Sequence, residues 1–270
     1  MDWVWHMSSL LKTALRGAFR AGHFTMRTSF QGRRFYFDPS TDIGWQLLVH
    51  GKFEHREFEV CRSFIDSKST VIDIGANIGL HTVAFSKAAS DGLVIAIEPS
   101  PRTFRWLLRN TEGLSNVVTL NVAVSSQCGI SEFFVTSDDA YSGLKDTGRK
   151  ALLRAIQVPC YTADHIVTPL LPRKVDLIKV DVEGLETEVV SGMRNIISRD
   201  RPVIFCEIYA GKASNPDPLC TIRSICNQRY RAYSFDGQNL RSFTTHDDNA
   251  YNYFFVPEEE VARYPMLTST

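Results

Sequence analysis

The sequence has no excess of charge of either sign, because its 270 residues include 30 Lys and Arg against 30 Asp and Glu. A dedicated nucleic-acid-binding protein usually shows a strong basic excess, so this balance argues against a nucleic-acid partner. No run of about 18 apolar residues occurs, which argues against a membrane-spanning helix. No secretory signal is evident. We therefore expect a globular protein of the cytoplasm.

The six cysteines form no Cys-x-x-Cys pair. This absence excludes the usual zinc-knuckle and thioredoxin-like motifs. Cys206 ends the apolar run Val203–Cys206, where a reduced thiol in the core is the expected role. The cysteine pattern is consistent with a reducing compartment.

The first part of the chain lacks acidic residues, since none occurs between positions 3 and 37. Apolar side chains at helical spacing predict a helix over residues 8–21, and its other face is basic. Such a helix can make a peripheral contact with an anionic membrane surface. It can equally pack on the domain through its apolar stripe. The sequence leaves both interpretations open.

The rest of the chain alternates between strand and helix patterns. Strands are expected at 70–74, 94–97, 117–124, 176–182 and 202–208, and helices at 79–90, 101–110 and 185–197. This alternation predicts an α/β fold with a doubly wound, mostly parallel sheet. Two late strands, at 231–235 and 252–256, are expected to end the sheet with an antiparallel strand. We divide the chain into a basic extension with a strand and helix lead-in, residues 1–49, and a main domain, residues 50–260.

A glycine turn follows the first clear strand of the main domain. The segment Asp73–Gly79 reads DIGANIG and opens a helix. Gly75 lets the backbone approach a ligand closely, while Asn77 tolerates a left-handed turn. Gly79 permits tight packing of the helix. Glu98 ends the next strand, where a carboxylate can accept hydrogen bonds from both ribose hydroxyls of a nucleoside.

The charge of this turn discriminates between cofactors. Ala76 and Asn77 break the G-x-G-x-x-G pattern, and Asp73 would repel a pyrophosphate. A cofactor with an amino group and a sulfonium fits better, so we favour S-adenosylmethionine over NAD and over an oxidoreductase function. The alternative is a turn that binds no nucleotide, with Asp73 hydrogen-bonded to backbone.

A second signature lies at residues 176–184, which read DLIKVDVEG. Together with the glycine turn, Glu98-Pro99 and the segment Asn252–Val256, it resembles the FkbM family of S-adenosylmethionine-dependent methyltransferases over residues 50–257. The resemblance implies the Rossmann-like, seven-stranded fold of class I methyltransferases. It also implies O-methylation of a hydroxyl group on a saccharide, glycolipid or other small natural product.

The resemblance also implies the roles of individual residues. Around the methionine part of the cofactor it places Asp73, Gly75, Asn77 and Gly79. Glu98 would hold the ribose, Asn121 and Ala123 would lie near the adenine, and Glu54, in the step Phe53-Glu54, would help to shape the cofactor pocket.

Two carboxylates of the second signature are the candidate catalytic residues. A hydroxyl must lose its proton when it is methylated, and Asp181 is our first candidate for the base. Glu183 either touches the substrate or stabilises the first turn of the following helix. With Glu207 these acids could hold Mg²⁺, although carboxylates alone are weak evidence for a metal. The polar loop Ser137–Gly143 is expected to act as a lid or substrate rim, where Tyr141 either stacks on a sugar ring or stays at the surface.

Two other functions remain open at this point. One is N-methylation of an amine or peptide, for which Asp181 would orient the acceptor rather than deprotonate it. The other is a non-catalytic cofactor-binding module, although the acids at 73, 98 and 181 argue against it. The sequence identifies neither the acceptor nor the oligomeric state.

Overall fold

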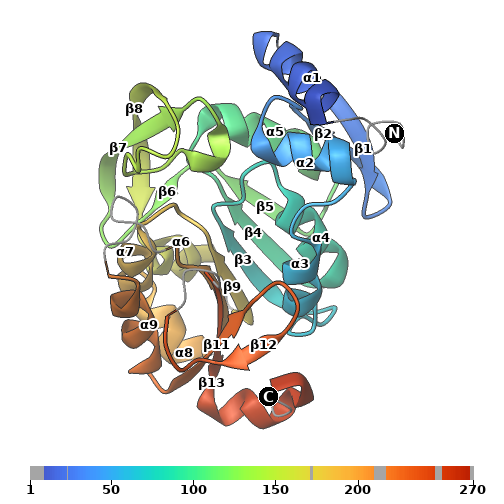
Figure 1. Ribbon diagram of the computed structural model, residues 1–270. Coiled ribbons are helices and arrows are strands. Elements are labelled where there is room, and N and C mark those ends of the chain that lie inside the picture. Colours follow the sequence, from blue (N-terminus) through green and yellow to red (C-terminus); the bar gives the residue numbers. More distant parts are fainter. Residues whose placement is uncertain (1–8, 23, 171–172, 210–216, 247–250, 268–270) are drawn as a thin grey trace.

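An eight-stranded sheet forms the centre of the molecule, and helices cover both of its faces (Figure 1). The structure is a computed structural model, which describes residues 9–22, 24–170, 173–209, 217–246 and 251–267. The strand order is β12-β11-β13-β10-β9-β3-β4-β5. The strands are β3 (Thr70–Ile74), β4 (Leu93–Ile97), β5 (Val117–Leu120), β9 (Leu177–Val180), β10 (Val203–Glu207), β11 (Tyr230–Phe235), β12 (Leu240–Ser242) and β13 (Asn252–Pro257).

The sheet is mostly parallel, which confirms the predicted fold class. β3, β4, β5, β9 and β10 run parallel, and β13 lies antiparallel between β10 and β11. The sheet has one strand more than the seven expected, since the turn after β11 leads into the short edge strand β12. In that turn Asp236 accepts hydrogen bonds from the amides of Gln238 and Asn239.

Successive strand residues point to opposite faces, and both faces are buried. Val71 and Val94 pack against helices α3 (His55–Arg62) and α4 (Leu80–Ala88). Ile72 and Ile95 pack against the opposite layer. That layer consists of α6 (Ala163–Leu170), α7 (Glu186–Ser191), α8 (Arg194–Asp200) and α9 (Pro218–Cys226). Burial on both faces explains why the strands are continuous apolar runs.

Two predicted elements are each divided in the structure. The strand expected at 117–124 ends at Leu120, and β6 (Ala123–Val124) joins a separate sheet with the order β6-β8-β7. The helix expected at 185–197 is divided into α7 and α8 at Gly192, where an added Cβ would lie 2.2 Å from the carbonyl oxygen of Ser125. In both places a close backbone contact with a distant segment overrides the local pattern.

The second sheet is an insertion between β5 and β9. β7 (Gly129–Thr136) and β8 (Leu152–Tyr161) form an antiparallel pair, where the sequence predicted two short strand-like pieces. The loop between them contains the short 3₁₀ helix η2 (Asp139–Tyr141). This loop extends over the edge of the main sheet and contributes to the site described below.

The N-terminal elements pack on the main domain. They are α1 (Ser9–Ala21), β1 (Met26–Phe30), β2 (Arg33–Phe37) and α2 (Asp42–His50). β2 packs against α5 (Pro101–Thr111), which lies between β4 and β5 in the main domain. Arg16 of α1 forms an ion pair with Asp42, and its guanidinium lies 5.6 Å from the ring centroid of Trp45. Phe37 and Leu47 share one apolar cluster with Leu80 of α4. The core therefore continues across the domain boundary that we predicted at residue 49, and the boundary itself stays a prediction.

Helix α1 confirms the predicted helix over most of residues 8–21. Its contacts with α2 agree with the packed interpretation. None of the helices in the described ranges is both long enough and apolar enough to cross a membrane. Peripheral contact with a membrane and a cytoplasmic location stay predictions.

The order of the strands locates the site. From β3 the chain continues outward to β4 and β5, and then returns to β9 on the other side of β3. Ligands of such sheets bind beyond the carboxyl ends of the strands, where the strand order reverses. The glycine turn, Glu98 and Asp181 follow β3, β4 and β9 at this edge.

Candidate active site

Two adjoining cavities open beyond the carboxyl ends of the parallel strands. The small cavity, about 580 Å³ with the open solvent at its mouth included, lies between the ends of β3, β4 and β9, the strands β6 and β7, and the loop after β7. The large cavity, about 1530 Å³ on the same measure, is more open and extends to α2 and α3. Five residues contribute to the lining of both cavities, namely Gly75, Asn77, Ala140, Asp181 and Glu183. Ligands in the two cavities would therefore meet beside these residues.

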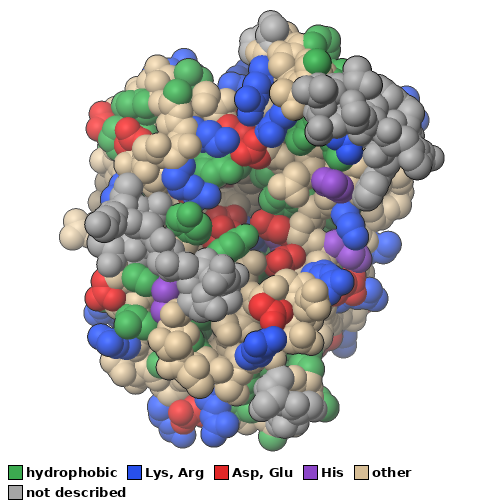
Figure 2. All heavy atoms as spheres, viewed as in Figure 1, with side chains coloured by type: hydrophobic (Ala, Val, Ile, Leu, Met, Phe, Trp, Pro, Cys, Tyr) green, Lys and Arg blue, Asp and Glu red, His purple; other side chains and the backbone are tan. Residues whose placement is uncertain are grey.

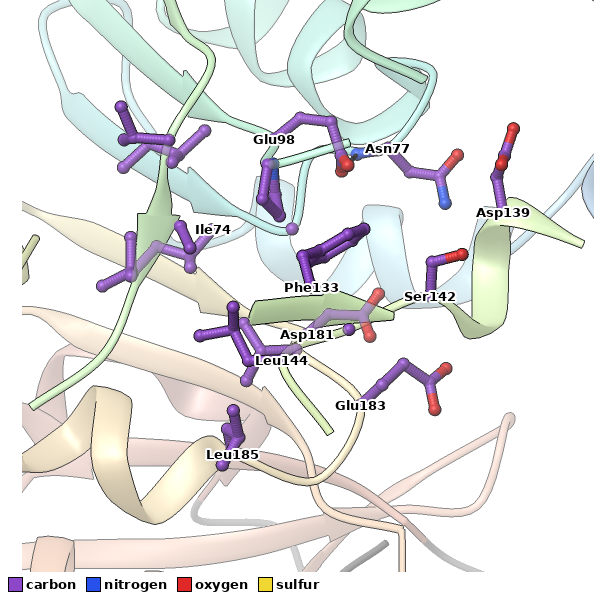
Figure 3. A pocket seen from close by; sticks show the side chains of 18 of the residues that line it. Ile74, Asn77, Glu98, Phe133, Asp139, Ser142, Leu144, Asp181, Glu183 and Leu185 are labelled. Carbon is purple, nitrogen blue, oxygen red and sulfur yellow. Dashed lines mark hydrogen bonds between the residues drawn. The ribbon is translucent and has the colours of Figure 1, made fainter. Parts of the chain in front are cut away.

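The two cavities differ in their walls. In the small cavity, Ile74, Leu144 and Leu185 form an apolar side, and Glu98, Asn77 and Asp139 lie on the other side of Phe133 (Figure 3). The large cavity is lined by many charged side chains. In the space-filling view, acidic side chains gather around a hollow in the middle of the face (Figure 2).

The glycine turn has the left-handed backbone that its sequence predicts. Gly75 has φ +77°, and an added Cβ would lie 1.8 Å from the carbonyl oxygen of Asp181, so no other residue fits between β3 and β9. Asn77 has φ +50°, and its side chain accepts a hydrogen bond from the amide of Ile78. Gly79 lies away from the lining of both cavities, where an added Cβ would lie 2.9 Å from Leu107 of α5. Gly79 thus permits close packing of two helices.

Glu98 is buried at the wall of the small cavity, with an exposed fraction of 6%. Its two carboxylate oxygens accept hydrogen bonds from the amides of Asn77, at 3.0 Å, and Ser100, at 2.8 Å. Burial raises the pKa of Glu98 to about 8, and the charge of Asp139 adds to this rise, although the two amides oppose it. A ligand that donates hydrogen bonds to this carboxylate would stabilise its charged form.

Asp73 lies behind the glycine turn and lines neither cavity. It is completely buried, and it accepts a hydrogen bond from the hydroxyl of Thr82 at 2.6 Å. Its other oxygen lies 3.8 Å from the ammonium group of Lys179. Burial raises the pKa of Asp73, against the opposing charge of Lys179. The carboxylate is therefore held by two side chains rather than by backbone, and its contact with a cofactor stays a prediction.

Asn121 and Ala123 follow β5 and have different surroundings. The side-chain amide of Asn121 donates hydrogen bonds to the carbonyl oxygens of Glu98 and Pro99, at 2.8 and 3.1 Å. Asn121 thus fixes the end of β4 and does not line the small cavity. Ala123 does line it, together with Val122 and Phe133.

Asp181 lines both cavities and is paired with a buried lysine that the sequence analysis did not single out. The ammonium of Lys179 lies 3.1 Å from Oδ2 of Asp181 and 3.4 Å from the carbonyl oxygen of Gly75. Burial opposes the charge of Lys179, but the carboxylates of Asp181, Asp73 and Glu54 outweigh it and raise the pKa of the lysine. The signal was a charged residue inside a buried strand, opposite Asp73 in the sheet register.

Glu183 precedes helix α7 and does not belong to its first turn, which begins at Glu186. It has φ +55° and lines both cavities. The guanidinium of Arg149 lies 2.6 Å from its carboxylate. Burial and the charge of Asp181 raise the pKa of Glu183 to about 7, although Arg149 opposes the rise. Of the two interpretations from the sequence, the position favours contact with a ligand, while Glu186 occupies the helix terminus.

Arg149 also holds the insertion loop in position over the site, a role that the sequence analysis did not predict. Its guanidinium carbon lies 4.5 Å from the ring centroids of both Tyr141 and Tyr209. The Tyr141 hydroxyl donates a hydrogen bond to Asp42 of α2 at 2.9 Å. Tyr141 therefore fastens the loop to α2, instead of offering a free ring to a sugar.

Glu54 lines the large cavity but not the small one. It has a left-handed backbone, with φ +43°, and its carboxylate lies 3.7 Å from Nδ1 of His81. Burial and the charge of Asp181 raise the pKa of Glu54 to about 8. Burial lowers the pKa of His81 well below its ordinary value, so its imidazole is neutral at pH 7. The contribution of Glu54 to the cofactor pocket stays a prediction.

Glu207 lies in the large cavity, and burial, followed by the charge of Asp181, raises its pKa well above the ordinary value. Within the described ranges, no three or more His, Cys, Asp or Glu side chains are arranged to hold a metal ion. Asp181, Glu183 and Glu207 thus do not converge as a ligand set there.

Comparisons with known proteins agree on one family. A model of the methyltransferase FkbM domain matches residues 73–246. Hexuronic acid methyltransferase AglP of Haloferax volcanii is 34% identical over 140 residues, which are 52% of this chain and 55% of that protein. Methyltransferase 1 of Beauveria bassiana is 25% identical over 182 residues, which cover 58% of this chain and 71% of that protein. The match thus spans little more than half the length of the Haloferax protein.

Among solved structures, the FkbM methyltransferase of Methylobacillus flagellatus matches 72% of this chain and 47% of its own. The TM-score is 0.47, and the sequence identity is 16%.

Proposed function

The chain belongs to the FkbM family of methyltransferases, and we propose that it transfers a methyl group from S-adenosylmethionine to a hydroxyl group of a saccharide or glycolipid. One observation carries this proposal. Asp181 and Glu183 line both cavities, so two carboxylates lie at the place where a methyl donor in the small cavity would meet an acceptor in the large one.

The residues of the small cavity fit this cofactor. Glu98 offers a carboxylate to the ribose hydroxyls, and Ala123 belongs to an apolar wall that suits the adenine. Gly75 and Asn77 leave room for the methionine part at the junction of the cavities. When bound, S-adenosylmethionine would supply a methyl group on a positively charged sulfur, and the rest of the cofactor would leave as a neutral thioether. The surrounding carboxylates favour this positive charge.

The large cavity suits a hydroxylated acceptor. Its lining combines the partly exposed ring of Tyr251, with an exposed fraction of 39%, with polar side chains such as Gln46 and Glu57. An aromatic face together with hydrogen-bonding groups can bind a sugar ring. The name of the Haloferax relative states that it acts on a hexuronic acid, which supports a saccharide acceptor for this chain.

In this proposal, Asp181 receives the proton of the acceptor. Its Oδ2 is held by Lys179, and Oδ1 accepts no hydrogen bond from any described residue. In the reaction the hydroxyl oxygen forms a bond to the methyl carbon, and its proton passes to Asp181 and then to solvent. Glu183, held by Arg149 at the same junction, contacts the acceptor and is the second possible proton acceptor.

Two measurements test the proposal. Isothermal titration should detect binding of S-adenosylhomocysteine to the pure protein, with NAD as the negative control. The protein is then incubated with a methyl-labelled donor and separate saccharide and lipid extracts, in which mass spectrometry should find a labelled methyl ether. Binding of NAD but not of S-adenosylhomocysteine would refute the cofactor assignment, and label only on nitrogen would refute the O-methylation.

A further inference from the structure

Asp139 carries a buried carboxylate oxygen for which the described residues offer no hydrogen bond of normal geometry, although the side chain of Thr103 lies near enough to lower the pKa of this acid. The side chain lines the small cavity and has an exposed fraction of 7%. Its Oδ2 lies 3.4 Å from Nε of Arg102, whereas Oδ1 has no hydrogen-bond partner within the described part of the chain. Leaving a buried charged oxygen without a partner is costly, and such groups in native proteins usually have a functional reason.

The neighbours of Asp139 indicate which ligand it faces. Arg102 follows Glu98 by only four residues at the start of α5, so its ion pair brings Asp139 beside the end of β4. The charge of Asp139 is one of the causes that raise the pKa of Glu98. Figure 3 shows Glu98 and Asp139 on the same side of the cavity, with Asn77 between them. Two carboxylates thus share one end of the proposed cofactor pocket.

This pair matches a vicinal diol. Each oxygen of Glu98 already accepts one backbone amide, from Asn77 or Ser100. A ribose presents two hydroxyl donors, and a second, unused acceptor nearby would give each hydroxyl its own carboxylate. The two donors would also reduce the repulsion between the two acids.

We propose that Oδ1 of Asp139 accepts a hydrogen bond from a ribose hydroxyl of the cofactor, as the partner of Glu98. The inference rests on the proposed function, because it assumes a nucleoside in the small cavity. It assigns cofactor recognition to a residue of the insertion between β7 and β8, outside the glycine turn and the strand ends. Asp138, which accepts a hydrogen bond from the amide of Asp42 at 2.7 Å, fixes this segment to α2.

The test is a ligand series on the full chain. The affinities of adenosine, 2′-deoxyadenosine, 3′-deoxyadenosine and purine riboside, which lacks the 6-amino group, are measured by competition with S-adenosylhomocysteine. In D139N the amide oxygen turns to Arg102 and leaves an NH₂ group toward the ligand. Adenosine and S-adenosylhomocysteine should bind roughly tenfold or more weakly, as expected for loss of a hydrogen bond to a charged group.

For the deoxyadenosine that lacks the hydroxyl bonded to Asp139, D139N and the wild type should bind with equal affinity. The control is D146N, an exposed acid of the same loop, which should bind as the wild type does. Thermal unfolding checks that D139N folds, and D139S replaces it in the series if it does not. The inference would be overturned if D139N weakened the binding of all four ligands equally. It would also be overturned if purine riboside were the only ligand whose affinity did not change in D139N. If the wild type binds no S-adenosylhomocysteine, the proposed function itself fails, so the two failures are distinguishable.

Discussion

The two cavities of this protein share an edge of the sheet but are built in different ways. The small cavity is lined by strand ends, by residues directly after them and by the insertion loop, and its charged side chains are the four acids Glu98, Asp139, Asp181 and Glu183. The large cavity takes much of its wall from α2, α3 and the insertion loop, and it carries charges of both signs. The proposed cofactor site thus lies at the strand ends and under the insertion loop, whereas the proposed acceptor site extends over helices α2 and α3.

The acids at the junction of the two cavities differ from Glu98 in having a cation beside them. At the junction, Lys179 and Arg149 each hold one of the two central carboxylates, Asp181 and Glu183. Removing a partner should therefore affect chemistry and stability at the junction, whereas changes in the small cavity should affect cofactor affinity alone.

The largest expected effect separates chemistry from cofactor binding. Replacing Asp181 with Asn should lower kcat for the hydroxylated acceptor by about 10²–10⁴-fold, because the proton acceptor is lost. The Kd of S-adenosylhomocysteine should change little, since Glu98 and the apolar wall are intact. Initial rates with the labelled methyl donor and isothermal titration measure the two quantities.

The matched control is D146N, in which an exposed acid is changed without contact with either cavity. If D181N keeps most of its activity, Asp181 is not the base. An amine acceptor, which needs orientation but no such base, would then be favoured.

The sequence predicted the small cavity better than the large one, for a physical reason. Gly75 and Asn77 belong to the turn between β3 and α4, and Glu98 directly follows the next strand, β4, so each is marked by a short local pattern. The partners of Lys179 and Arg149 depend on contacts between segments far apart in the chain. A short sequence pattern does not reveal that Asp73 of β3 lies opposite Lys179 of the neighbouring strand β9.

The same distinction explains the errors in the fold. The strand predicted at 117–124 is mostly apolar, yet the side chain of Asn121 within it donates a hydrogen bond to the carbonyl oxygen of Glu98, and the regular strand ends at Leu120. The helix at 185–197 breaks where Gly192 packs on Ser125. Asp139 belonged only to a polar loop in the sequence, and its proximity to Glu98 arises from the fold of the insertion. Local geometry was predictable, whereas contacts across the chain were not.

The second prediction concerns the buried charges behind the junction. Replacing Lys179 with Met leaves Asp73 and Asp181 without their cation, and should lower the free energy of unfolding by about 3–5 kcal/mol. Burial already raises the pKa of Asp73, so the folded variant would bind a proton more readily than the unfolded chain. The stability loss should therefore be larger at pH 8 than at pH 5.

Urea denaturation at the two pH values measures this loss, with K174M, an exposed lysine in the same segment, as the control. The double variant D73N/K179M should recover part of the stability, because the unpaired charge of Asp73 is then absent. Equal stability losses in K179M and K174M would show that the buried ion pair contributes little.

The smallest expected effect belongs to the small cavity and depends on pH. Burial raises the pKa of Glu98 to about 8, so most of this carboxyl is protonated at pH 7 in the free protein. Ribose hydroxyls donate to the charged form, so binding should favour loss of the proton. The Kd of 5′-methylthioadenosine, which lacks the titratable α-amino and carboxylate groups of the methionine part, should be roughly tenfold higher at pH 7 than at pH 9.

Isothermal titration from pH 6 to pH 9 gives this profile, and buffers of different ionisation enthalpy should reveal proton release at pH 7. E98Q should bind weakly with a flatter profile, and the remaining slope would come from Asp139, whose pKa burial also raises. An affinity of the wild type that does not change with pH would mean that the ribose does not meet these carboxylates. The small cavity would then lose its distinction as the nucleoside site, and the large cavity would have to hold both ligands.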